Sequence, residues 1–163
     1  MTQRMIALVT VIVLFLVLSP AAHAGKVATL KEIKQPKGLY VDKTQLYITE
    51  NATIFIYSLD DFKLIKKFGQ KGQGPQEFQT LPHVPVSIDV TTDKIIAGSI
   101  RKVSYFTKKG EFINEVRAKT LALKIKPCGD GFLGWSQAKS KGVIYNTICL
   151  YDAKLEKKQE IRS

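Results

Sequence analysis

Four segments decide the fold of this chain: PKGLYVD (36–42), QLYITEN (45–51), TIFIY (53–57) and LIKKFG (64–69). Each segment is short, is alternating or β-branched, and is bounded by turn residues, which is typical of a β-strand. A unit of four such strands cannot bury both of its faces alone, so it must stack on neighbouring units of the same kind. The pattern therefore predicts one four-stranded blade of a β-propeller.

The same pattern recurs twice further along the chain. Strand patterns lie at 86–90, 94–98, 102–106 and 112–116 in the second copy, and at 122–126, 132–135, 146–151 and 158–161 in the third. Tyr57 and Tyr105 occupy matching places 48 residues apart, and Leu150 follows Tyr105 by 45 residues, a period that suits four-stranded blades. No helical period of 3.6 residues follows the N-terminal segment. We therefore predict an all-β domain with about three blades. Its boundaries are 25–163 for the domain and approximately 36–78, 84–117 and 121–161 for the blades.

The glycine-rich segment between the first two copies, residues 68–78, reads FGQKGQGPQEF. Together with the first two segments quoted above, it resembles an NHL repeat, and more closely the exported six-bladed β-propeller proteins of bacteria, which show a similar FG-x-x-G-x-G-P-x-x-F signature. The resemblance is good over 36–78, only patterned over 84–117 and weak over 121–161. It implies blades packed round a central channel. It also implies a binding face built from the loops between second and third strands and from the connections between blades.

The chain departs from this family in length. A six-bladed ring of this repeat needs roughly 240–300 residues, and three blades make half of it. Residues 27–33 resemble the outer strand that closes the ring in the family. Three interpretations follow. The chain is a piece or truncated product of a longer propeller, or two copies assemble as three blades plus three. A self-standing monomer of three blades is the least favoured. Open blade faces and edges predict self-association.

The N-terminal segment has the order of a secretory signal peptide, residues 1–24. Arg4 lies in a short basic start, residues 5–18 are almost wholly apolar, and Ala24 ends a small-x-small cleavage pattern with Gly25 as the new N-terminus. We therefore expect export to the periplasm or beyond. The alternative is a membrane anchor formed by residues 5–18, although this core is short for a span of about 20 residues.

Net charge limits the classes of partner that we expect, and the cysteine positions indicate whether a disulfide can form. The formal net charge is +11, and 21 of the 25 basic residues are lysines. A lysine-rich exported chain suits a solvated surface or attraction to acidic envelope polymers. Nucleic acid is not an expected partner, because arginine makes the usual bidentate phosphate and base contacts. Cys128 and Cys149 fall on strands held about 10 Å apart by the strand between them, so two free thiols are expected.

The glycine-rich loop has two interpretations. Gly72 and Gly74 could expose backbone amides as an anion nest. A phosphate-binding loop, however, opens a helix and carries a Lys-Ser/Thr pair, whereas Pro75 follows here. The favoured interpretation is a connector between blades, in which glycine permits positive φ and Phe68 and Phe78 fill the core.

The sequence contains few residues in the arrangements that catalysis requires. His83 is a lone loop histidine, and no G-x-S-x-G motif is present. Turn chemistry accounts for Asp42, Asp89, Asp93 and Asp130. We therefore expect no catalytic, cofactor-binding or metal-ligating residue in this chain. Trp135 is interpreted as a core residue rather than a sugar-stacking platform.

The sequence thus favours a non-catalytic binding module with one basic face, for an acidic protein or polysaccharide of the cell envelope. That face is expected to consist of the loops 50–52, 99–102 and 137–141 and the glycine-rich connector. Its expected cations are Lys71, Arg101, Lys102, Lys139 and Lys141. Two alternatives stay open: a piece of a propeller hydrolase or lyase whose site lies in other blades, and a truncated remnant without function.

Overall fold

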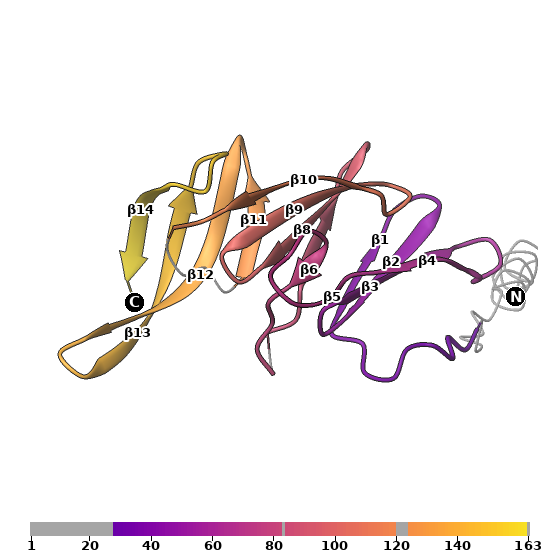
Figure 1. The fold of residues 1–163 in the computed structure, drawn as a ribbon, viewed down its shortest axis with the longest axis horizontal. Coiled ribbons are helices and arrows are strands. Elements are labelled where there is room, and N and C mark those ends of the chain that lie inside the picture. Colours follow the sequence, from indigo (N-terminus) through magenta and orange to yellow (C-terminus); the bar gives the residue numbers. More distant parts are fainter. Residues whose placement is uncertain (1–27, 83, 120–123, 163) are drawn as a thin grey trace, which may run out of the picture.

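The computed structural model describes residues 28–82, 84–119 and 124–162 (Figure 1). These residues form strands and turns, and no helix among them has the length and apolarity needed to cross a membrane. The predicted signal peptide, its cleavage site at Ala24 and Gly25, and His83 lie outside the described residues.

Three four-stranded antiparallel sheets follow one another along the chain. Blade 1 consists of β1 (Gly38–Val41), β2 (Gln45–Glu50), β3 (Thr53–Ser58) and β4 (Leu64–Phe68). Blade 2 consists of β7 (Ser87–Val90), β8 (Lys94–Ser99), β9 (Lys102–Thr107) and β10 (Phe112–Arg117). Blade 3 consists of β11 (Lys124–Cys128), β12 (Gly131–Ser140), β13 (Val143–Tyr151) and β14 (Lys157–Arg162). Two short parallel strands, β5 (Gln70–Lys71) and β6 (Glu77–Phe78), lie in the connector between blades 1 and 2.

The blades pack face to face, as a propeller requires. Strand β1 contacts β7, and β11 contacts β7 and β8, so the first strands of successive blades lie side by side. One apolar cluster joins blades 1 and 2 around Ile54, Phe78 and Phe106. A second joins blades 2 and 3 around Val103, Ile125 and Tyr151. The all-β, three-blade prediction is confirmed, and Figure 1 shows the blades in succession from indigo to yellow.

Polar contacts between the first strands fix the spacing of the blades. The Tyr40 hydroxyl donates to the carbonyl of Val90 at 2.9 Å, which ties blade 1 to blade 2. The Ser87 hydroxyl donates to the carbonyl of Ile125 at 3.0 Å, which ties blade 2 to blade 3. A Cβ at Gly98 would lie 2.9 Å from that carbonyl oxygen of Ile125, so glycine permits this close approach.

Blade 3 differs from the sequence prediction at one hairpin. Residues 137–141 were expected to form a loop, but Gln137–Ser140 continue strand β12 and pair with β13. The turn consists of Lys141 and Gly142 alone, both at positive φ (48° and 83°), which is the backbone that a two-residue hairpin needs. Three of the four residues 137–140 are polar, which suggested a loop. Polar residues also form strands, however, when a partner strand binds their backbone. The β12–β13 hairpin therefore extends beyond the other blades (Figure 1).

The expected ring-closing strand at 27–33 is not formed by the described part of that segment. Residues 28–33 contain a turn, with the amide of Ile33 donating to the carbonyl of Leu30. Leu30 and Ile33 pack instead on blade 1, on its face away from blade 2. The hydroxyl of Tyr57 also donates to the Glu32 carboxylate at 3.1 Å. A segment without a neighbouring strand edge finds its burial on the nearest apolar surface.

An ion pair locks blade 1 to the turn between β9 and β10 of blade 2. The ammonium of Lys108 contacts the carboxylate of Asp42 and lies 5.1 Å from the centre of the Tyr47 ring. Burial alone would raise the pKa of Asp42, but hydrogen bonds from Lys108, from the amides of Thr44 and Gln45 and from the Tyr47 hydroxyl together hold that pKa well below its usual range. Both side chains are largely shielded from water, so the pair is worth more than an exposed one.

We predict that Lys108→Met lowers the free energy of unfolding by about 1–3 kcal/mol, because it leaves the Asp42 carboxylate without its cation. The neighbouring exposed Lys109→Met should change it by less than about 0.5 kcal/mol. Urea unfolding at neutral pH measures both.

The effect of Lys108→Met should depend on pH with a defined sign. A carboxyl whose pKa is lowered on folding contributes fully above its unfolded pKa of about 3.9, and this contribution is lost as pH falls through the folded value. The difference between wild type and Lys108→Met should therefore shrink below about pH 4. A difference that stays constant down to pH 2 would contradict the assignment.

Candidate functional site

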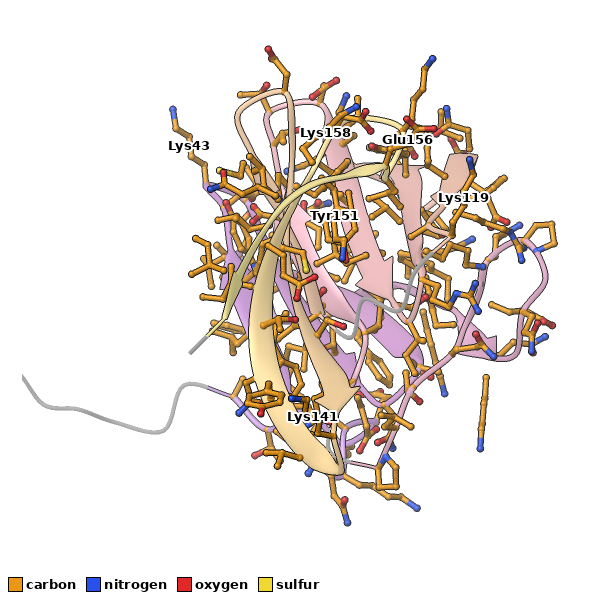
Figure 2. The ribbon with its side chains drawn as sticks, turned by 90° about the vertical axis from the view of Figure 1, so that its left-hand side faces the viewer. Lys43, Lys119, Lys141, Tyr151, Glu156 and Lys158 are labelled. Atoms are coloured by element: carbon orange, nitrogen blue, oxygen red, sulfur yellow. The ribbon has the colours of Figure 1, made fainter. Side chains whose placement is uncertain are left out.

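The turns between second and third strands gather at one end of the blades, together with the connectors that link one blade to the next. The amide of Val86 donates to the carbonyl of Asn51 at 2.9 Å, and the amide of Ala118 donates to the carbonyl of Arg101 at 2.8 Å. Each connector is thus anchored on the turn of the preceding blade. Figure 2 shows Lys141 at this end of the molecule, with Lys43 and Lys158 at the opposite end.

The glycine-rich connector closes around its own carboxylate. The amide of Gly74 donates to Glu77 at 2.8 Å, and the side-chain amide of Gln70 donates to the other carboxylate oxygen at 2.8 Å. The Gly74 amide, followed by the Gln70 side chain, lowers the pKa of Glu77. A Cβ at Gly72 would collide with Glu77, so glycine makes room for it. The Gly74 amide that an anion nest would offer is already bound by Glu77.

The connector interpretation is confirmed by its packing. Phe78 is fully buried and Phe68 is 9% exposed, and both lie in the core between blades 1 and 2. Gly69 has φ of 83° and lies under the Phe78 ring, where a Cβ would come within 2.6 Å of the ring. The two phenylalanines of the signature hold the connector, and the glycines permit its path.

Lys102 lies beneath this connector and holds it from the other side. Its side chain is 6% exposed, and its ammonium donates to the carbonyl of Gly74 at 2.8 Å. The same ammonium pairs with Glu115 at 3.1 Å and lies 6.0 Å from the centre of the Phe78 ring. Lys102 therefore joins the connector to strands β9 and β10. Its positive charge is balanced by Glu115 inside the protein.

A cavity of about 190 Å³ lies between the connector and blade 2. The connector contributes Gly72, Gln73 and Gln79; the turn from β8 to β9 contributes Ser99, Ile100, Arg101 and Lys102; the end of β10 contributes Arg117 and Ala118. The connector and blade 2 thus build the cavity, and the connector packing described above sets its shape.

Two guanidinium groups line this cavity. Arg117 Nη2 donates to the carbonyl of Gln73 at 2.6 Å, and its guanidinium pairs with Glu115. Arg101 Nη2 donates to the carbonyl of Lys119 at 2.7 Å, and Arg101 makes no ion pair with a described residue. Ser99 is 2% exposed, and its hydroxyl finds no hydrogen-bond partner among the described residues. The cavity therefore offers positive charge, which suits an anionic group.

The five predicted cations take different places. Lys71 and Arg101 are exposed beside or on the cavity, and Lys141 is exposed at the tip of the β12–β13 hairpin. Lys102 is buried, and the backbone of Lys139 lies in β12 opposite Ile144. Arg101 and Lys102 both line the cavity, Lys71 directly precedes the lining residue Gly72 in the chain, and Lys139 and Lys141 lie on the separate hairpin.

Sequence reasoning missed Arg117 and Glu77. Arg117 ends a fourth strand, where the chain enters a connector, and that position is the only signal that could have marked it. Glu77 occupies a variable position of the family-like signature, so the signature does not mark it. Cys128 and Cys149 are free thiols, as predicted. No group of three or more His, Cys, Asp or Glu in the described residues is placed to hold a metal ion.

We predict that Lys102→Met lowers the free energy of unfolding by about 2–4 kcal/mol, because it removes a buried cation and leaves Gly74 and Glu115 short of a partner. Lys71→Met, an exposed change in the same connector, should stay within about 0.5 kcal/mol of wild type. Equal urea midpoints for the two variants would contradict a structural role for Lys102.

No protein-family model matches the chain, and the search of curated proteins finds no match either. Among solved structures, the chain is similar to the crystal structure of BamB from Moraxella catarrhalis, with 8% sequence identity and a TM-score of 0.42. The match covers 84% of this chain and 52% of that one, so the chain spans about half the length of the structure that it matches. The propeller assignment of this chain rests on the strand order and blade packing described above.

Proposed function

We propose that this chain is an exported binding module of the NHL-like propeller type, whose basic face takes an acidic protein or polysaccharide of the cell envelope. The observation that carries the proposal is the cavity beside Arg101 and Arg117, with Lys71 exposed next to it. An anionic side chain or sugar carboxylate is the group that such a site would hold.

The cations at the cavity end support this choice of face. Lys71, Arg101 and Lys141 make no ion pair with a described residue, and Arg101 and Arg117 both line the cavity. At the opposite end Lys63, Lys94, Lys108 and Lys158 pair with nearby acids, whereas Lys43, Lys109 and Lys154 make no ion pair with a described residue. The arginines beside the cavity therefore favour this end, because a guanidinium binds a carboxylate through two parallel hydrogen bonds.

Lys102, one of the five predicted cations, is not expected to contact a partner. Because this charge is paired with Glu115 and bound to Gly74, it contributes little to a ligand outside. The exposed cations Lys71, Arg101 and Lys141 are the ones that a partner meets first. Charge reversal of these three therefore tests binding without removing a group from the protein interior.

We predict that Lys71→Glu, Arg101→Glu and Lys141→Glu together weaken binding to polygalacturonate and to polyglutamate by at least about tenfold at low salt. The matched control carries Lys43→Glu, Lys109→Glu and Lys154→Glu in turns at the opposite end, with the same change in net charge. The control should stay within about threefold of wild type. Fluorescence anisotropy with labelled polymers, at low and high salt, measures both.

Equal weakening by the two triple variants would show that only net charge matters, and the proposed face would be wrong. Absence of binding by the wild type to both polymers at low salt would overturn the proposed function itself. Loss of binding to one polymer alone would identify the class of partner.

A further inference from the structure

The guanidinium of Arg101 keeps one of its two edges for a ligand. A guanidinium has five N–H donors, and either edge can bind a carboxylate through two parallel hydrogen bonds. Nη2 of Arg101 donates one bond to the carbonyl of Lys119, which holds the group in place and occupies at most one edge. Neither Nε nor Nη1 has a hydrogen-bond partner among the described residues. Arg101 therefore lines the cavity as a held group that can still bind a carboxylate with two bonds.

The charges around the cavity are one negative charge short. Nε and Nη2 of Arg117 bind Glu115 at 2.9 and 2.6 Å, and Lys102 shares the same carboxylate. Three cations, Arg101, Lys102 and Arg117, thus stand against two acids, Glu115 and the Glu77 carboxylate of the connector. Nη1 of Arg117 has no hydrogen-bond partner in the described part of the chain. A single carboxylate supplies the missing charge and an acceptor for these donors.

The size and the lining of the cavity favour a protein side chain over a sugar. Pockets that enclose a small molecule usually measure about 300–1,000 Å³, whereas this cavity measures about 190 Å³. None of its described lining residues is aromatic, so a sugar ring has no aromatic face to pack on. The side-chain amides of Gln73 and Gln79 make no hydrogen bond with a described residue, and each can donate to or accept from the backbone of a polypeptide.

These observations, which rest on the proposed function, narrow its partner to one class. We infer that the cavity is the anchor site for a protein, and that it receives the carboxylate of one aspartate or glutamate side chain. Arg101 binds this carboxylate through two parallel hydrogen bonds and determines the specificity of the site, while Arg117 supplies further charge and one donor. Lys71, which directly precedes the lining residue Gly72, attracts acidic residues beside the anchor.

Oligoglutamate and oligogalacturonate of equal length test this choice, because they carry the same number of carboxylates on different backbones. The wild type should bind labelled oligoglutamate at least about tenfold more tightly than oligogalacturonate in fluorescence anisotropy at low salt, because only a side-chain carboxylate enters the cavity. This comparison needs no variant, so it decides the choice of partner whatever a substitution does to folding.

Arg101→Lys tests the role of the guanidinium, because it keeps the charge and removes the planar pair of donors. It should weaken oligoglutamate binding by about tenfold and change oligogalacturonate binding by less than about twofold. Lys109→Arg, an exposed change at the opposite end that also keeps the charge, is the control and should change neither affinity by more than about twofold. Circular dichroism confirms that both variants fold.

The contrary outcomes separate this inference from the proposed function. Oligogalacturonate bound as tightly as oligoglutamate would overturn the inference and leave the proposed function in place. The same holds if Arg101→Lys weakens both oligomers equally or leaves oligoglutamate binding unchanged, because the guanidinium would then make no specific contact. Binding of neither oligomer by the wild type would overturn the proposed function, and the inference with it.

Discussion

A blade of four strands has two apolar faces, and only another blade covers such a face well. This constraint shapes the whole structure: among the residues that the structure describes, blade 2 packs on blade 1 through one face and on blade 3 through the other. The contacts are close where the first strands meet, with Gly98 leaving room for the carbonyl of Ile125.

The fold also explains how the basic cavity arises. A connector must cross from the outer strand of one blade to the first strand of the next, and here it is held by Phe78 in the core, by Glu77 on the Gly74 amide and by Lys102 on the Gly74 carbonyl. The held connector forms one wall of the cavity, and the turn with Arg101 forms another. Two neighbouring cations therefore differ in their surroundings: Lys102 is paired inside the protein and supports the wall, whereas Arg101 is exposed and lines the cavity.

The strands and blades could be predicted from the sequence, because β-branched runs such as Thr53–Ser58 and turn residues at each end depend only on neighbours in the chain. The site could be predicted only in part. The neighbouring sequence does not show that Lys102 is buried and Arg101 exposed. Lys102 is buried because the fold brings Gly74 and Glu115 to it from distant parts of the chain. The turn at Lys141–Gly142 was hidden among polar residues that form a strand. Long-range contacts, rather than composition, decided these outcomes.

The central claim is that blade stacking, rather than any single blade, holds this protein together. Amide hydrogen exchange of the dilute monomer tests it most directly, because it measures the stability of each strand separately. The account predicts the slowest exchange in β8 and β9 of the middle blade, and faster exchange in β13 and β14, whose exposed Ile148 and Ile161 are not covered by a described blade. Exchange in blade 3 that is as slow as in blade 2, under monomeric conditions, would contradict it.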